Sequence, residues 1–234
     1  MWLFPLAAAL VALAFTVALV RRFLERPRPY LGFWSAALAM YAVASLAVAI
    51  GVGSGWSRST FELYWILGAV LNVPLLAAGE LRLLTRNRFV DAAIWIALAF
   101  VVAYTIAVVR GAEMQPTALT EQLPSGKEVF GDGTAAHRLP QLISIPSYLI
   151  LVGGAIWSAW RMRGRRELRD RFLGTLLIVV GASITAIAGS AFAATGNATA
   201  FSIALLAGVA VMFAGFLRAT RAPSPSAAIT STSG

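Results

Sequence analysis

The residues of this sequence that could do chemistry are polar residues set inside long apolar stretches. Asn72 and Pro74 lie close together in one of these stretches. Proline has no amide proton, so Pro74 leaves the carbonyl of Val70 without its helical partner and opens a kink. A polar group beside such a kink can bind a substrate, or it can form an ordinary hydrogen bond between helices. Both interpretations stay open for Asn72 and Pro74.

Glu80 lies near the end of the same stretch, and Arg82 follows two residues later. A carboxyl group in hydrocarbon is costly, so it is either functional or paired. Glu80 is therefore a candidate for a proton-coupling carboxylate or for one half of an interfacial ion pair with Arg82. Its position close to the end of the stretch favours the ion pair.

A second stretch carries Ser183 and Thr185 among small residues such as Gly181 and Gly189. Small residues let helix backbones approach closely, and hydroxyl groups can form hydrogen bonds across the contact. The pattern favours a helix packed in the centre of a bundle. The same hydroxyl groups could line a narrow polar path for a substrate.

These residues are positioned by seven apolar stretches. Each stretch is close in length to the ~20 residues that a helix needs to cross ~30 Å of hydrocarbon. They cover residues 2–20, 30–53, 61–84, 90–109, 141–160, 172–194 and 199–217. Every backbone amide in lipid needs a partner inside its own segment or in a closed barrel, and these runs are too uniformly apolar for barrel strands. The sequence therefore predicts an all-α, polytopic membrane protein: a transmembrane domain over 1–218 with an outer loop over 110–140, and a disordered tail over 219–234.

The cations alternate between the two sides of this arrangement. Fifteen of the 19 lie in the odd-numbered loops and the tail, and four lie on the other side. The positive-inside rule then predicts insertion in the plasma (inner) membrane, with the amino terminus outside and the carboxyl terminus in the cytoplasm. The same distribution accounts for the net charge of +9, together with attraction to anionic lipids, so no nucleic-acid partner is expected.

The most basic loop joins the fifth and sixth stretches. Four of its arginines are candidates to hold lipid headgroups: Arg163, Arg165, Arg166 and Arg169. This possibility keeps a lipid-modifying enzyme as a minor alternative. However, the sequence has no nucleophile beside a base, no paired acids at helical spacing within an apolar stretch and no phosphate-binding glycine loop. It has no cysteine and one histidine, His137, so neither an enzyme nor a metal or cofactor site is expected.

The two halves of the chain resemble each other. Residues 21–32 match residues 163–174 in spacing, with Arg21, Glu25, Leu31 and Gly32 falling on Arg163, Glu167, Leu173 and Gly174. Stretches one to three and five to seven enter the membrane in the same orientation. The fourth would then link a parallel 3+1+3 repeat. Chance similarity between apolar helices and basic loops is the alternative.

A seven-helix 3+1+3 plan resembles the SWEET sugar facilitators and related PQ-loop proteins, and also the microbial rhodopsins. The rhodopsin resemblance implies a retinal-binding lysine in the seventh helix, but the only lysine here is Lys127 in the outer loop. The SWEET resemblance implies an asparagine at a central cavity, which Asn72 could supply, although the seventh stretch has Gly208 at the corresponding position. Pro140 and Gln141 form one Pro–Gln pair, without a partner pair in the first half.

These observations favour a transporter or facilitator for a small neutral solute, with a cavity between two three-helix units. A different class of function stays open. The protein could be a membrane sensor or an assembly subunit, in which the outer loop over 110–140 receives a signal or a partner membrane protein. Either kind of protein could form a homo-oligomer.

Overall fold

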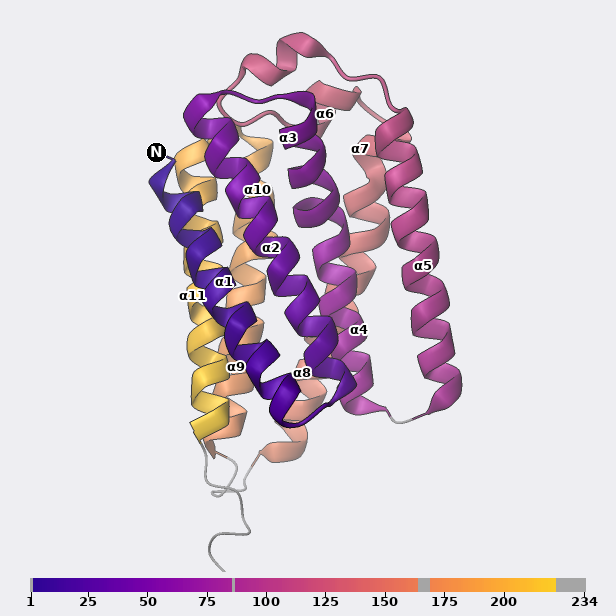
Figure 1. Cartoon of the computed structure of the whole chain (residues 1–234), viewed down its shortest axis with the longest axis vertical. Helices are drawn as coiled ribbons and strands as arrows, with labels where there is room; N and C mark the ends of the chain where they lie inside the picture. The colour runs from indigo at the N-terminus through magenta and orange to yellow at the C-terminus, as the bar shows by residue number, and fades with distance from the viewer. Residues whose placement is uncertain (1, 86, 164–168, 222–234) are drawn as a thin grey trace, which may run out of the picture.

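A computed structural model describes residues 2–85, 87–163 and 169–221, and in this part of the chain the regular secondary structure consists of helices joined by loops (Figure 1). Seven helical spans are long and apolar enough to cross a membrane, which confirms the predicted all-α, seven-helix class. The single-piece spans are α1 (Leu3–Glu25), α2 (Pro29–Ser54), α5 (Arg88–Gly111) and α11 (Ala198–Arg221).

The other three spans each contain a π-helical segment, in which the backbone bonds run from residue i to residue i+5. The third consists of α3 (Arg58–Leu63), η1 (Tyr64–Leu71) and α4 (Asn72–Leu84). The fifth consists of α7 (Ala135–Leu139), η3 (Pro140–Ser144) and α8 (Ile145–Met162), and the sixth of α9 (Arg169–Ser183), η5 (Ile184–Ala188) and α10 (Gly189–Ala194).

Six spans form a closed ring of neighbours, and α5 lies outside it. Going round the ring, α1 packs on α2, α2 on α4, α4 on α8, α8 on α9, α9 on α11, and α11 on α1. The helix α5 stands at the edge of the molecule beside the third span (Figure 1). This order of neighbours is compatible with a 3+1+3 plan, and the internal repeat stays a prediction.

The third span is the most buried element of the bundle. In its most apolar window 72% of the residues are buried, against 17% for α5. The third span contacts α2, α5 and α8, so side chains on nearly all of its faces meet protein. A polar group on this span must therefore find its partner within the protein.

The helices α9 and α11 approach each other through glycines. A Cβ added at Gly181 would lie 2.5 Å from the carbonyl oxygen of Gly208. A Cβ at Gly208 would lie 2.8 Å from the carbonyl of Gly181 and would overlap the hydroxyl of Thr185. The backbones of these two helices can lie this close only because neither position carries a side chain.

The outer cap, residues 112–134, folds over one end of the bundle (Figure 1). It contains the short helices η2 (Pro116–Thr120) and α6 (Gly126–Phe130). Within residues 125–133, Gly126–Phe130 form the helix α6, and a turn follows at Asp132 and Gly133. Ser125 and Glu128 form a capping box, and the Ser125 hydroxyl and amide hold the pKa of Glu128 below its usual range.

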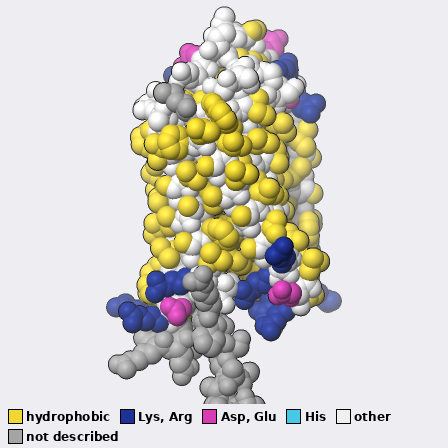
Figure 2. Space-filling view, turned by 60° about the vertical axis from the view of Figure 1, so that its left-hand side comes forward, with side chains coloured by type: hydrophobic (Ala, Val, Ile, Leu, Met, Phe, Trp, Pro, Cys, Tyr) yellow, Lys and Arg dark blue, Asp and Glu magenta, His cyan; other side chains and the backbone are white. Residues whose placement is uncertain are grey.

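Charged side chains gather at the two ends of the molecule and leave a broad apolar band between them (Figure 2). The helix α11 continues to Arg221, three residues past the predicted domain boundary at 218. Residues 222–234, the rest of the predicted tail, lie outside the described part of the chain. Which end of the bundle faces the cytoplasm stays a prediction from the arginines, and the two ends are called outer and inner after that prediction.

Reporter fusions in a bacterial host test the orientation. A green fluorescent protein fused after Gly234 should fluoresce, because the arginine-rich end is expected in the cytoplasm. Alkaline phosphatase inserted after the exposed Thr117 of the outer cap should be active. The reverse pattern at both positions would overturn the topology.

Replacing Gly208 with alanine should destabilise the contact between α9 and α11, because the new methyl group overlaps Thr185 and crowds the carbonyl of Gly181. Overpacking of this kind costs about 2 kcal/mol, so the purified variant should unfold at a lower temperature. Gly153→Ala is the matched control, since a Cβ there meets nothing within 4 Å. Equal unfolding temperatures for the two variants would contradict the close approach.

Candidate functional site

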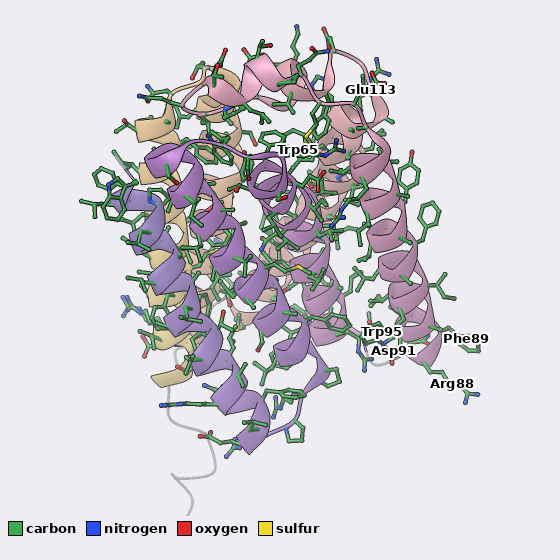
Figure 3. The ribbon with its side chains drawn as sticks, turned by 45° about the horizontal axis from the view of Figure 1, so that its top comes forward. Trp65, Arg88, Phe89, Asp91, Trp95 and Glu113 are labelled. Carbon is green, nitrogen blue, oxygen red and sulfur yellow. The ribbon has the colours of Figure 1, made fainter. Side chains whose placement is uncertain are left out.

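The outer end of the third span is fixed to the cap by an aromatic cluster consisting of Trp56, Phe61, Tyr64, Trp65 and Phe130. Two of the indole groups also donate hydrogen bonds to the cap and to the start of the fifth span. Trp56 Nε1 donates to the carbonyl of Gln122 at 3.0 Å, and Trp65 Nε1 donates to the carbonyl of Ala136 at 3.1 Å. Trp65 lies under the cap in the middle of this end of the bundle (Figure 3). The cap is therefore docked on the third span.

Glu62, one turn into the third span, is buried and forms two ion pairs. Its carboxylate accepts a hydrogen bond from Arg58 Nε at 2.9 Å, and it lies 3.4 Å from Arg110 Nε at the end of α5. A second nitrogen of Arg58 donates to the carbonyl of Arg110 at 3.2 Å. This group of charges attaches α5 to the third span at the outer end.

Farther into the membrane, the third span is hydrogen-bonded to the fifth near the point where η1 passes into α4. The hydroxyl of Ser144, at the end of η3, donates to the carbonyls of Ala69 and Val70 at 2.8 and 3.1 Å. Val70 is the residue whose carbonyl Pro74 frees by lacking an amide proton. Two π-helical segments, η1 and η3, thus meet at this point. The structure places a neighbouring side chain, Ser144, at the opening that the sequence assigned to a ligand or a neighbour.

Asn72 lies at the start of α4 and is buried. Its amide nitrogen Nδ2 donates to the carbonyl of Ala37 in α2 at 2.7 Å. This is the hydrogen bond between helices that the sequence offered as the alternative to substrate binding. In the structure described here, Asn72 and Pro74 hold the third span against its neighbours.

Ser183 and Thr185 lie in a different environment, where α9 changes into η5. Both are half-buried, and both meet a tyrosine. The Ser183 hydroxyl lies 2.7 Å from the phenol oxygen of Tyr148 in α8. The Thr185 hydroxyl donates to the carbonyl of Gly181 one turn back at 3.2 Å and lies near the phenol of Tyr41 in α2, which donates to the carbonyl of Leu205 in α11 at 2.8 Å. Hydroxyl groups from α2, α8 and the sixth span therefore form a polar layer inside the bundle.

Sequence reasoning missed Tyr41, Tyr148 and Ser144, although each is a hydroxyl group inside a span. Tyrosine is enriched at the two membrane interfaces, so a tyrosine in an apolar stretch is easily taken for an interfacial anchor. A signal was available, because Tyr41 and Tyr148 lie many residues from the ends of their spans. A phenol at that depth needs a hydrogen-bond partner.

At the inner end of the third span, the ion pair joins Arg82 to Asp91 of α5, and not to Glu80. Asp91 lies on the side of α5 that meets α4, and this pair attaches α5 at its second end. Glu80 is buried against α8, where it lies near the hydroxyl of Ser158. Among the described residues, none forms a hydrogen bond with Glu80 Oε1.

The arginines expected at lipid headgroups are only partly described. Arg163 and Arg169 are exposed at the inner end of the bundle, where anionic headgroups would lie. Arg165 and Arg166 lie outside the described residues.

A shallow, open pocket of about 310 Å³ lies in the outer cap. Its lining consists of Gln115, Thr117, Ala118, Glu121 and Glu128. It is therefore made from the cap alone, on the outer side of the aromatic cluster, and none of the residues expected to bind a substrate reaches it.

Comparisons of the chain with protein-family models, curated proteins and solved structures found no match. The resemblance to SWEET and PQ-loop proteins stays an expectation drawn from the number and direction of the spans.

Gly154 provides a direct test of how tightly Glu80 is held. A Cβ at Gly154 would lie 2.6 Å from Glu80 Cγ and 3.0 Å from Leu84 Cδ1. Gly154→Ala should therefore lower the stability of the purified protein by about 2 kcal/mol, measured by thermal unfolding in detergent. The neighbouring Gly153→Ala should leave it unchanged or slightly raised, since alanine favours helix. A Gly154→Ala protein as stable as Gly153→Ala would show that α4 and α8 are not packed as described.

Proposed function

We propose that the protein is a transporter or facilitator for a small uncharged solute, with its site at the polar layer of Tyr148, Ser183, Thr185 and Tyr41. The observation that carries the proposal is that Ser183, Thr185 and Tyr148 are half-buried inside the membrane span. Hydroxyl groups in the spans of a membrane protein usually form all of their hydrogen bonds to neighbouring packed helices. Half-buried ones, on two adjacent spans, can exchange their mutual hydrogen bonds for bonds to a solute.

The chemistry of the layer indicates the class of solute. Its members are phenol and aliphatic hydroxyl groups, which both donate and accept hydrogen bonds and carry no charge. The charged residues of the described spans lie toward the two ends, apart from Glu80 in the inner part of the third span. A solute with hydroxyl or amide groups would match this layer better than an ion would.

Two further features support a site that opens and closes. The polar layer adjoins η5, while η1 and η3 meet beside it through Ser144. π-Helical segments are rare and often occur at functional sites, because a span can change its register there. The six spans form a closed ring with α5 outside it, and this arrangement can be divided into two three-helix units that could move against each other.

The chain has no cysteine, so single introduced thiols give an unambiguous accessibility test. Thr185→Cys in sealed membrane vesicles should react with a membrane-impermeant maleimide added from either side, because alternating access exposes the site to each side in turn. Ser45→Cys, at a buried serine of α2, is the control that should stay unreacted. Thr117→Cys, in the outer cap, should react from one side only.

Lack of reaction at Thr185→Cys from both sides would mean a solid bundle and would remove the transport proposal. Reaction from a single side would mean a fixed cleft, which also contradicts alternating access.

A membrane sensor is the second candidate function, and the docking of the cap favours it. The indoles of Trp56 and Trp65 connect the cap and the start of the fifth span directly to the most buried span. A ligand that displaced the cap would shift the third span and, through it, the inner end of the bundle. An unreactive Thr185→Cys combined with a partner protein that is lost on deleting residues 112–134 would support this function instead.

A further inference from the structure

The third span contains two buried glutamates in opposite electrostatic surroundings. Glu62 is 8% exposed and is paired with Arg58 and Arg110. Glu80 is 4% exposed, and among the described residues it has no ion-pair partner. A buried carboxylate needs a cation or strong hydrogen-bond donors to stay charged, and otherwise it takes up a proton.

The groups around Glu80 offer few hydrogen bonds and no positive charge to stabilise a carboxylate there. On α8 the absence of a side chain at Gly154 leaves room for the carboxyl, whose Oε1 would lie 3.2 Å from an added Cβ. The hydroxyl of Ser158, one turn along α8, lies near the carboxyl. On α2 the indole of Trp34 packs against Gly79, and its Nε1 already donates to the carbonyl of Leu76. One neutral hydroxyl is a weak substitute for a guanidinium group.

The charged groups on the surrounding helices are engaged elsewhere or lie at helix ends. Arg82 on α4 is paired with Asp91 on α5, and Arg110 at the far end of α5 is paired with Glu62. The other ionisable residues on the elements packed against α4 are Tyr30 and Tyr41 on α2, Tyr64 on η1, Tyr148 and Arg161 on α8, and Arg88 and Tyr104 on α5, with none on η3. Arg161 and Arg88 are exposed at helix ends.

We propose that Glu80 is a proton-binding site: its carboxyl is a neutral acid while α4 and α8 are packed together, and it releases its proton when they separate. In the release step the O–H bond breaks, the proton passes to water entering from the inner end of the bundle, and a carboxylate remains. Solvation of that carboxylate then opposes the return of α4 to α8 until a proton is bound again. The site does not depend on the proposed transport activity, since a sensor could use the same contact.

Infrared spectroscopy of the purified protein in lipid nanodiscs tests the site, because a protonated carboxyl has a C=O stretch that a carboxylate lacks. At neutral pH the unmodified protein should show this band, and Glu80→Gln should lose it. The band should disappear reversibly as the pH is raised. Glutamine keeps the shape and neutrality of the protonated acid, so Glu80→Gln should fold, which size-exclusion chromatography checks.

Glu62→Gln is the matched control, since it removes a buried acid from the same span but one that is already paired with arginines. It should keep the protonated-acid band unchanged. The proposal is overturned if the unmodified protein lacks the band at neutral pH, if Glu80→Gln keeps it, or if the band persists at every alkaline pH at which the protein remains folded.

Discussion

The structure depends on one constraint: a polar group buried in a membrane span must be satisfied by the protein itself. The third span, Arg58–Leu84, is the most buried element and meets this constraint differently along its length. Glu62 is neutralised by two arginines, and Asn72 donates to a carbonyl of α2. Ser144 of the fifth span satisfies the carbonyl freed by Pro74. Each of these interactions holds a neighbouring helix against the third span. Together the hydrogen bonds and ion pairs determine how α2, α5 and α8 are placed.

The same constraint explains how α5 is attached to the bundle. The contacts within the ring of six spans differ in how tightly they are packed. The helix α5 has few buried residues, yet it is attached at both ends, by Arg110 at the outer side and by Asp91 at the inner side. The ring of six spans is tightly packed where α9 meets α11 through glycines. It is looser where half-buried hydroxyls lie between α8 and the sixth span. The layer also includes Tyr41 of α2, so a movement of the two three-helix units against each other would open it.

The seven spans could be predicted because hydrocarbon thickness and hydropathy determine them almost alone. Their ends were less exact, since α1 continues to Glu25 and the fifth span begins at Ala135, five and six residues beyond the predicted limits. Ser183 and Thr185 could be identified as polar residues inside a span, but their partners Tyr148 and Tyr41 could not, because spacing along one helix does not reveal which helices are neighbours. Asn72 illustrates the same limit. Whether its amide faces a solute or the carbonyl of Ala37 is decided by how α2 packs on α4. The helix at 126–130 was predictable in principle, since Ser125 and Glu128 have the spacing of a capping box.

The central claim is that the bundle opens at the polar layer beside η5, while α11 and the outer part of the third span remain packed. Hydrogen–deuterium exchange of the protein in nanodiscs measures this directly, because amides exchange only where a helix opens to water. The account predicts faster exchange in residues 183–190 than in the glycine-packed part of α11 around Gly208. Equal and complete protection of the two segments would contradict it and would identify the bundle as a rigid unit.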